Sequence, residues 1–270
     1  MTNFVVLRSY RRSDEPFCKI LLRNGIMENI NRTLIELILK DVTLNVAITV
    51  VLTLFLLLGF SILSCIIAMI IKGIVLYVIT YISFWAIAKK IQKEVSEIPR
   101  IYKSDNSSYF WVAEIYEDYL LNRHQQDQKY IFMTEKKFNE SNINVFRYVK
   151  KIVGTIALCK STRLQNSGWI KRLSVHKDYR RKGIGTNLVN LALQFGSQQG
   201  YRRINVIISE PRKAARELFS KKGFEIYLYR RRFFYRTSVL LLFVELTYRM
   251  RYNDNDAELL ATDPFYTQAH

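Results

Sequence analysis

The chain has 270 residues and a formal net charge of +18 at pH 7. Its three scattered cysteines, Cys18, Cys65 and Cys159, argue against a disulfide framework or a zinc site and suit a reducing compartment. The length suits one large domain, or one domain with an accessory segment, and the basic balance suggests nucleic acid, anionic lipid or an anionic cofactor as partner.

The N-terminal part predicts a strand followed by two helices. Phe4–Tyr10 has the composition of a strand. Ser13 or Asp14 is expected to cap a helix that runs toward Gly25, and the aliphatic residues of Asn31–Leu39 predict a second helix.

A long apolar segment follows. Val42–Ala88 contains one basic residue, Lys72, and no acid. It begins too late and is too long for a cleavable signal. As a helix its roughly 47 residues would measure about 70 Å, against about 30 Å for the hydrocarbon core of a bilayer. The segment therefore predicts a hairpin, either two full spans or a re-entrant loop, with its turn near Gly59–Ser64 or at Lys72-Gly73.

Basic residues at both ends of this segment predict its orientation. Lys40 precedes it, and Lys89, Lys90 and Lys93 follow it. Because cytoplasmic flanks of membrane segments are enriched in Lys and Arg, both flanks are expected on the cytosolic side. If Phe4–Tyr10 also joins the sheet of the later strands, both flanks must lie on the same side of the membrane.

The middle of the chain predicts two strands with a long connection. Residues 94–108 have the composition of a polar linker, Tyr109–Glu114 of a strand, and Lys151–Cys159 of another strand. Ile115–Lys150 is irregular, charged and rich in asparagine. We expect it to be an insertion near an acceptor site, a solvated excursion, or disordered.

The stretch Trp169–Leu188 predicts a strand, a basic turn and a helix. Alternating apolar residues end the strand at Val175, and the turn reads Arg-Arg-Lys-Gly-Ile-Gly from Arg180 to Gly185. One apolar face then recurs at helical spacing, in Ile184, Leu188, Leu191, Ala192 and Phe195. The first N–H groups of a helix lack helical partners and attract anions, and glycine allows a close approach. This arrangement predicts a pyrophosphate site.

The C-terminal part predicts further strands and one helix. Ile204–Ile208 is an apolar strand and Arg212–Lys222 a helix with one apolar face. Phe224–Tyr229 and Thr237–Tyr248 are expected to pair as strands, with Arg230-Arg231-Arg232 between them. The last 18 residues, 253–270, form a polar tail.

Arg180-x-x-Gly183-x-Gly185, between a strand and a helix, resembles the acyl-CoA-binding signature of the GNAT N-acetyltransferase superfamily. The P-loop and dinucleotide-binding glycine patterns are absent. The later Ala214-Ala215-x-x-Leu218-Phe219 helix, ending at Gly223-Phe224, strengthens the resemblance. The apolar hairpin, the YFWVAE strand, YRRKGIG and LALQFGSQQGY are similar to the camello, or N-acetyltransferase-8-like, branch.

This resemblance implies a mixed α/β GNAT fold with a central, mostly antiparallel sheet, interrupted by an inserted transmembrane hairpin. The expected parts are residues 1–41, the hairpin 42–88, the rest of the catalytic domain 89–252 with its insertion 115–150, and the tail. It also implies a membrane-bound enzyme of the endoplasmic reticulum that transfers acetyl from acetyl-CoA to an amine, such as a cysteine S-conjugate, aspartate or a protein lysine. Membrane lipid is an expected partner. Neither a metal nor nucleic acid is expected, since no zinc finger, helix-turn-helix or RNA-binding signature occurs.

The resemblance also places the cofactor. The two strands Trp169–Val175 and Ile204–Ile208 are expected to separate in a V and admit the pantetheine, and the backbone of Arg181–Thr186 to bind the pyrophosphate. The residues expected to contact acetyl-CoA are Leu173, Val175, Arg180, Arg181, Lys182, Gly183, Gly185 and Thr186.

Catalytic residues are harder to name because two positions depart from the family pattern. Camello-type members usually have a histidine where this chain has Arg172, and many GNAT enzymes have a tyrosine where it has Phe219. Glu210 is a candidate base or a solvated strand end, and Tyr227 or Tyr229 a candidate acid. Two hypotheses stay open: an N-acetyltransferase, or a catalytically silent acyl-CoA-binding protein of the same fold.

Overall fold

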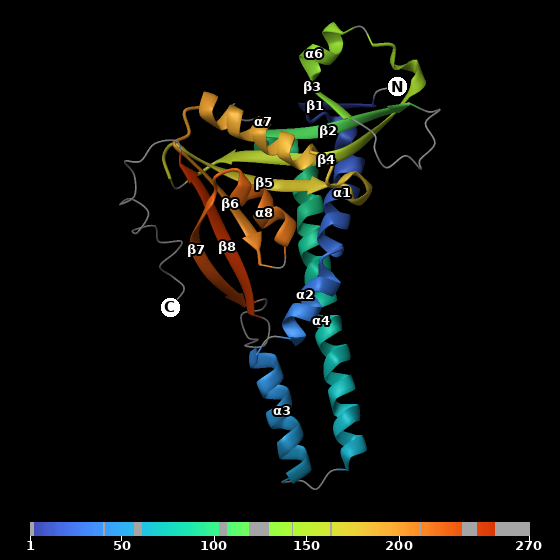
Figure 1. Ribbon diagram of the computed structural model, residues 1–270, viewed down its shortest axis with the longest axis vertical. Coiled ribbons are helices and arrows are strands. Elements are labelled where there is room, and N and C mark those ends of the chain that lie inside the picture. The colour runs from blue at the N-terminus through green and yellow to red at the C-terminus, as the bar shows by residue number, and fades with distance from the viewer. Residues whose placement is uncertain are drawn as a thin grey trace.

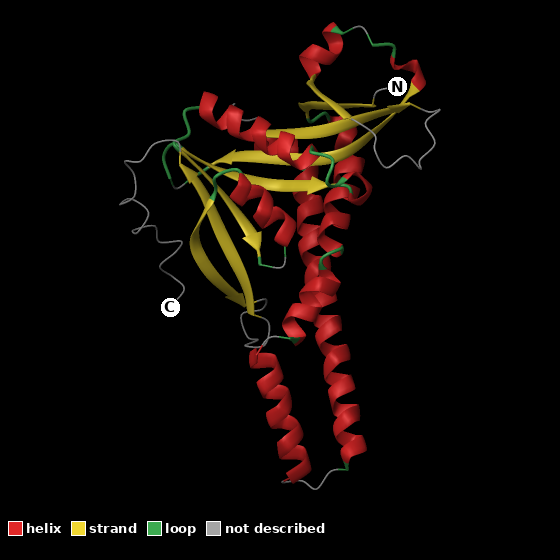
Figure 2. Cartoon of the chain, viewed as in Figure 1, coloured by secondary structure: helices red, strands yellow, loops and turns green. Residues whose placement is uncertain are grey.

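The computed structural model describes residues 3–39, 41–56, 61–102, 107–118, 130–141, 143–162, 164–210, 212–233 and 242–251. Their strands are β1 (Asn3–Ser9), β2 (Tyr109–Asp118), β3 (Tyr130–Thr134), β4 (Tyr148–Lys160), β5 (Ser167–Val175), β6 (Arg203–Ser209), β7 (Glu225–Phe233) and β8 (Leu242–Arg251). Their α-helices are α1 (Glu15–Met27), α2 (Ile30–Ile38), α3 (Asp41–Leu56), α4 (Ile62–Ser96), α5 (Ile98–Tyr102), α6 (Glu135–Glu140), α7 (Ile184–Gln198) and α8 (Lys213–Lys221). Figures 1 and 2 show a twisted sheet with helices against it and a helical pair that projects away.

The strands form one eight-stranded sheet in the order β3-β1-β2-β4-β5-β6-β8-β7. Only the β1–β3 and β5–β6 pairs of this sheet are parallel. The structure thus confirms the expected mixed α/β fold with a mostly antiparallel sheet. It also places the N-terminal strand inside that sheet, with Val6 opposite Glu114 of β2.

Both faces of the sheet centre are covered. One face packs against α7, and the other packs against α1 and the last turns of α4 (Figure 1). For this reason β4 is buried continuously from Ile152 to Leu158 instead of in alternation. The close approach of α7 requires a glycine in β4, since a Cβ on Gly154 would lie 2.9 Å from Leu188 Cδ1.

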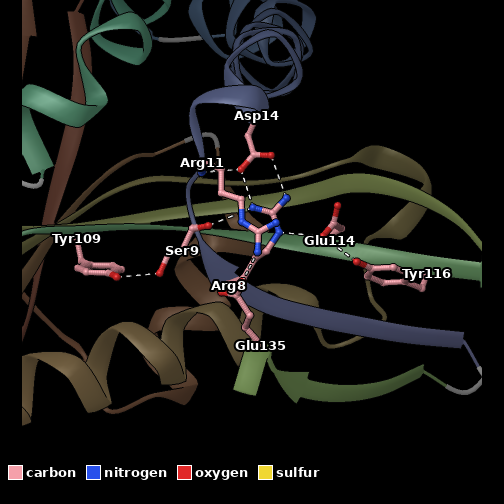
Figure 3. A network of polar contacts seen from close by, with 8 residues as sticks. All are labelled: Arg8, Ser9, Arg11, Asp14, Tyr109, Glu114, Tyr116 and Glu135. Atoms are coloured by element: carbon pink, nitrogen blue, oxygen red, sulfur yellow. Dashed lines mark hydrogen bonds and ion pairs between the residues drawn. The ribbon is translucent and has the colours of Figure 1, made fainter. Parts of the chain in front are cut away.

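A buried ion-pair network connects β1 to its neighbours (Figure 3). Arg8 donates Nη1 and Nη2 to the two carboxylate oxygens of Asp14, at 2.7 and 2.9 Å, and Nε to Glu114 at 2.8 Å. Burial opposes the charge of Arg8, but both carboxylates outweigh it, so the pKa of its guanidinium is raised. Asp14 also accepts a hydrogen bond from the Arg11 N–H at 2.8 Å. The network therefore ties the start of α1 to the sheet.

The helical pair consists of α3 and the first part of α4. Helix α3 ends at Leu56 and α4 begins at Ile62, whereas Lys72-Gly73 lies within α4, so the second of the two expected turn positions is wrong. Of the described helices, α4 is the one long and apolar enough to cross a bilayer. Its outward side chains Ile66, Ile70 and Ile74 are 51, 58 and 57% exposed. An exposed apolar surface of this kind is unfavourable in water and is typical of a surface that contacts lipid or another protein.

The structure corrects three expectations about local structure. Residues 94–108 are not simply a linker, because α4 continues to Ser96 and α5 follows, with Ile98 and Tyr102 buried against the sheet. Ile115–Lys150 contains β3 and α6, because Tyr130–Thr134 adds an edge strand beside β1. The Arg230–Arg232 run belongs to β7, an edge strand, where charged side chains are tolerated. The expected strand start at Thr237 lies outside the described residues.

Candidate acyl-CoA site

Strands β5 and β6 separate part-way along their length. They pair in parallel from Ser167 opposite Arg203 to Ile170 opposite Val206, and their pairing ends there. The expected V-shaped opening is therefore confirmed. Beyond Ile170 the edge of β5 that faces β6 has no strand partner among the described residues, so its backbone groups can bind an extended ligand.

The turn after β5 brings the start of α7 to this opening. Gly183 has φ +82° and precedes the first residue of the helix, while Arg181 has φ +64°. Glycine adopts this left-handed conformation without strain. The Gly183 carbonyl accepts its first helical bond from the Asn187 N–H at 3.0 Å. The N–H groups of Ile184, Gly185 and Thr186 therefore have no partner within the helix.

Gly185 lies in this first helical turn and has no side chain. A Cβ built on Gly185 would lie 3.5 Å from Leu218 Cδ2 and 3.8 Å from Val175 Cγ2, which are ordinary contacts. The fold itself would therefore accept alanine at this position. The lack of a side chain fits close approach by a phosphate group, and the residues present fit an acyl-CoA pyrophosphate.

The three cations of the turn point to different places. Arg180 donates Nε to the Val175 carbonyl at 3.0 Å and pairs with Glu28 at the end of α1. Lys182 donates to the Tyr130 hydroxyl at 2.9 Å. Arg181 is the most exposed of the three: its side chain is 80% exposed, and its Nη1 lies 3.8 Å from a Glu217 oxygen of α8. Arg180 and Lys182 therefore brace the turn, whereas Arg181, held only by this long and exposed contact, is the cation most accessible to a phosphate.

A cavity of 690 Å³ lies behind the opening, between β5, β6 and α8 on one side and α1, α2 and α4 on the other. Leu173 lines this cavity, whereas Val175 and Arg180 line a smaller one of 230 Å³ beside α1. The lining of the larger cavity is mostly apolar, and no Asp, Glu, His or Tyr belongs to it among the described residues. Its polar and charged members are Asn29, Thr33, Lys171, Arg172, Ser174, Ser209 and Arg212.

Residues 98–224, from the start of α5 to just before β7, match the model of the Acetyltransferase (GNAT) family. This region contains the opening, the turn and α7. The chain carries a GNAT acetyltransferase domain.

Two curated proteins are similar to this chain. N-acetyltransferase family 8 member 3 of Rattus norvegicus is 29% identical over 156 residues, 53% of this chain and 54% of that protein. The protein named probable N-acetyltransferase camello, from Xenopus tropicalis, is 24% identical over 135 residues, 50% of this chain and 47% of that protein. The match thus spans about half the length of these relatives. A GNAT acetyltransferase structure from Staphylococcus aureus Mu50 is 16% identical, covers 92% of this chain and 99% of its own, and has a TM-score of 0.47.

Two positions of the GNAT domain differ from the expected catalytic pattern. Phe219 is 1% exposed, lies edge-on to Phe224 with ring centroids 5.0 Å apart, and lines the cavity without a hydroxyl. Arg172 also lines the cavity, but its guanidinium pairs with Glu94 of α4. Neither side chain can act as a general acid at neutral pH, because phenylalanine has no acidic proton and arginine does not lose its own.

The candidate base Glu210 is an exposed residue of the turn after β6, outside the cavity lining. Its charge nevertheless acts on Glu36 of α2. Burial and then the charge of Glu210 raise the pKa of the Glu36 carboxyl, while Arg32, Lys213 and Arg216 oppose that rise. Glu36 lies one helical turn beyond Thr33, which lines the cavity. A carboxyl with a raised pKa is the better proton acceptor, so Glu36 joins Glu210 as a candidate base.

Glu36, Glu94 and Arg212 are residues that sequence reasoning did not single out. The expected acids Tyr227 and Tyr229 lie on β7, outside the cavity lining. Glu94 followed the apolar segment and was expected in a linker, although one helical repeat runs through Phe84, Ile87, Ile91 and Glu94. That repeat was the signal in the sequence that the helix continues past the apolar segment.

Proposed function

We propose that this protein is a membrane-anchored N-acetyltransferase that transfers acetyl from acetyl-CoA to an amine. The observation that carries the proposal is the opening between β5 and β6, with the free N–H groups at the start of α7 beside it and a cavity behind it. The backbone of Arg181–Thr186 would hold the pyrophosphate. The open edge of β5 at Leu173 and Val175 would hold the pantetheine, as family resemblance also implies.

In the reaction, the neutral amine forms a C–N bond to the thioester carbonyl carbon, the C–S bond breaks and releases CoA as its thiolate, and the amine nitrogen gives up one proton to a base. The cavity walls on α2 and α4 would receive the amine opposite β5. Apolar walls of this kind favour the neutral form of an amine over its ammonium form. Glu36, one helical turn beyond the lining residue Thr33, and Glu210, next to the lining residue Ser209, are our candidates to accept the proton.

The charged lining favours an acceptor with an anionic group close to its amine. Arg212 lines the cavity, where the described lining contains no carboxylate, and burial lowers the pKa of its guanidinium; Lys171 lies at the same lining, whereas Arg172 is already paired with Glu94. A buried cation gains most from an ionic partner. We infer that an amino acid or a derivative that keeps its carboxylate fits better than a lysine side chain.

Membrane anchoring rests on α4 and on its surroundings. Ile62–Ile82 would measure about 31 Å as a helix, close to the thickness of the hydrocarbon core. Beyond it, Lys89 lies over the Trp85 ring, 4.4 Å from the centroid, an arrangement typical of a membrane interface. We propose that both flanks of the hairpin face the cytosol at the endoplasmic reticulum, where acetyl-CoA is available.

A coupled pair of assays tests the function. Isothermal titration with acetyl-CoA, on the full chain in detergent, is expected to detect binding. Release of the CoA thiol is then followed with an amine panel that contains amino acids, their amides and lysine peptides. Binding without release for any amine would favour the second candidate, a silent acyl-CoA-binding protein, which the missing Tyr and His side chains in the cavity support. Absence of binding would refute both.

Protease treatment of intact microsomes tests the orientation. Tags at both termini are expected to be digested before detergent is added. Protection of both tags would mean a lumenal catalytic domain. Protection of one tag would mean an odd number of crossings, which is incompatible with β1 lying inside the sheet.

A further inference from the structure

A β-bulge interrupts β5 at the point where it leaves β6. Ser174 lies opposite Thr155 and Lys171 opposite Ala157, so Arg172 and Leu173 together face the single residue Ile156. Arg172 has φ +56°, a left-handed conformation that is uncommon for residues other than glycine. Bulges bend a strand and persist only where surrounding contacts hold them. The residues that hold this bulge therefore determine how β5 presents itself to a ligand.

Contacts from two directions hold Arg172. Thr155 Oγ1 of β4 donates to the Arg172 carbonyl at 2.9 Å. The guanidinium donates Nε to Glu94 Oε1 at 3.0 Å and Nη2 to the other oxygen, a two-point contact. Such paired contacts set orientation as well as strength.

Glu94 is itself held in place. The hydroxyl of Tyr102, a residue 1% exposed, donates to Glu94 Oε1 at 2.8 Å. The side chains of Arg172 and Glu94 are 23 and 22% exposed, so water screens their interaction only in part. One turn before Glu94, Ile91 lines the cavity together with Arg172. The membrane-directed helix α4 thus reaches the bulge through one carboxylate.

We propose that Glu94 and Arg172 are positioning residues that hold the β5 bulge so that the open edge of the strand aligns the acyl group of acyl-CoA. The pair acts through the backbone of β5 and does not itself react. This inference rests on the proposed function. The pyrophosphate would be held elsewhere, by the turn before α7, so binding strength and acyl alignment are separable.

The test compares Glu94→Gln with wild type in the full chain. Gln keeps the shape of the side chain but removes the charge. We expect kcat at saturating acetyl-CoA to fall about tenfold or more, and the Kd for acetyl-CoA to change less than threefold. Glu97→Gln is the matched control: it breaks the exposed Glu97–Arg100 pair just beyond α4 and is expected to leave both constants unchanged.

A double-mutant cycle strengthens the test. If the two residues act as one unit, Glu94→Gln combined with Arg172→Gln should lose no more kcat than the worse single variant. Tyr102→Phe, which leaves the ion pair intact, should give a smaller loss. A thermal unfolding midpoint for each variant shows whether it is folded.

Several results would overturn the proposal. A kcat for Glu94→Gln within twofold of wild type would do so, as would a rise in Kd that matches the fall in kcat, because uniform loosening is a structural effect. Additive losses in the cycle would also refute it. Wild-type protein that turns over no amine would refute the proposed function first, and this inference with it.

Discussion

Gly185→Ala should separate the stability of the fold from its affinity for acetyl-CoA. Gly185 lies in the first turn of α7, and the new Cβ would meet Leu218 and Val175 at 3.5 and 3.8 Å, without a clash. Replacing a helical glycine by alanine stabilises a protein by about 0.5–1 kcal/mol. For a chain of this size that predicts a rise in Tm of about 1–3 °C.

Binding should change in the opposite direction. Because a Cβ tilts toward the N-terminus of its helix, we expect the methyl group to narrow the approach of phosphate oxygens to the N–H groups of Ile184–Thr186. A hydrogen bond to a charged group is worth about 1.5–3 kcal/mol, so losing one or two predicts a Kd at least about tenfold higher. Greater stability with weaker binding is an outcome that a general packing defect cannot produce.

Thermal unfolding and titration with acetyl-CoA measure the two effects on the same sample. Gly73→Ala on α4 is the matched control, because its Cβ would meet nothing within 4 Å and it belongs to the apolar part of α4, not to the turn before α7. It should raise stability and leave Kd unchanged. Gly183→Ala should lower both the stability and the affinity for acetyl-CoA, since alanine at φ +82° costs about 1–2 kcal/mol and distorts the turn. Unchanged affinity in Gly185→Ala would refute the placement of the pyrophosphate.

Two further predictions concern stability. Arg8→Leu removes the cation between the buried carboxylates of Asp14 and Glu114, and denaturant titration should show a loss of about 3–5 kcal/mol of unfolding free energy. Arg100→Leu, which breaks an exposed ion pair, should lose less than about 1 kcal/mol. Equal losses in the two variants would contradict the buried network. Burial, and then the charge of Lys151, lower the pKa of His176 in the folded protein, so protonation of this side chain opposes folding. The stability that is present above the unfolded pKa of about 6.5 should therefore fall as the pH drops below it. Between pH 7.5 and 5.5, the Tm of His176→Gln should fall less than the Tm of wild type.

Local patterns in the sequence were enough for much of this fold. The period-2 strands, the Arg180–Gly185 turn and the helix after it follow from interactions among near neighbours, and the structure contains all three. The length and apolar character of residues 42–88 likewise predicted a helical hairpin without knowledge of the sheet. The glycines at positions 183 and 185 predicted an anion-binding turn, because the need for residues without a side chain at such a turn depends only on near neighbours.

Contacts between distant residues required the tertiary structure. Arg172 and Glu94 are 78 residues apart, and neither pattern around them indicates the other. The pairing of β3 with β1 and the proximity of Glu36 to Glu210 also join residues that are far apart in the sequence. Such contacts depend on how the sheet twists and how α2 and α4 dock on it, which is decided by the packing of the whole core. The sequence by itself therefore determined the turn before α7, whereas only the fold decided which charges surround the cavity.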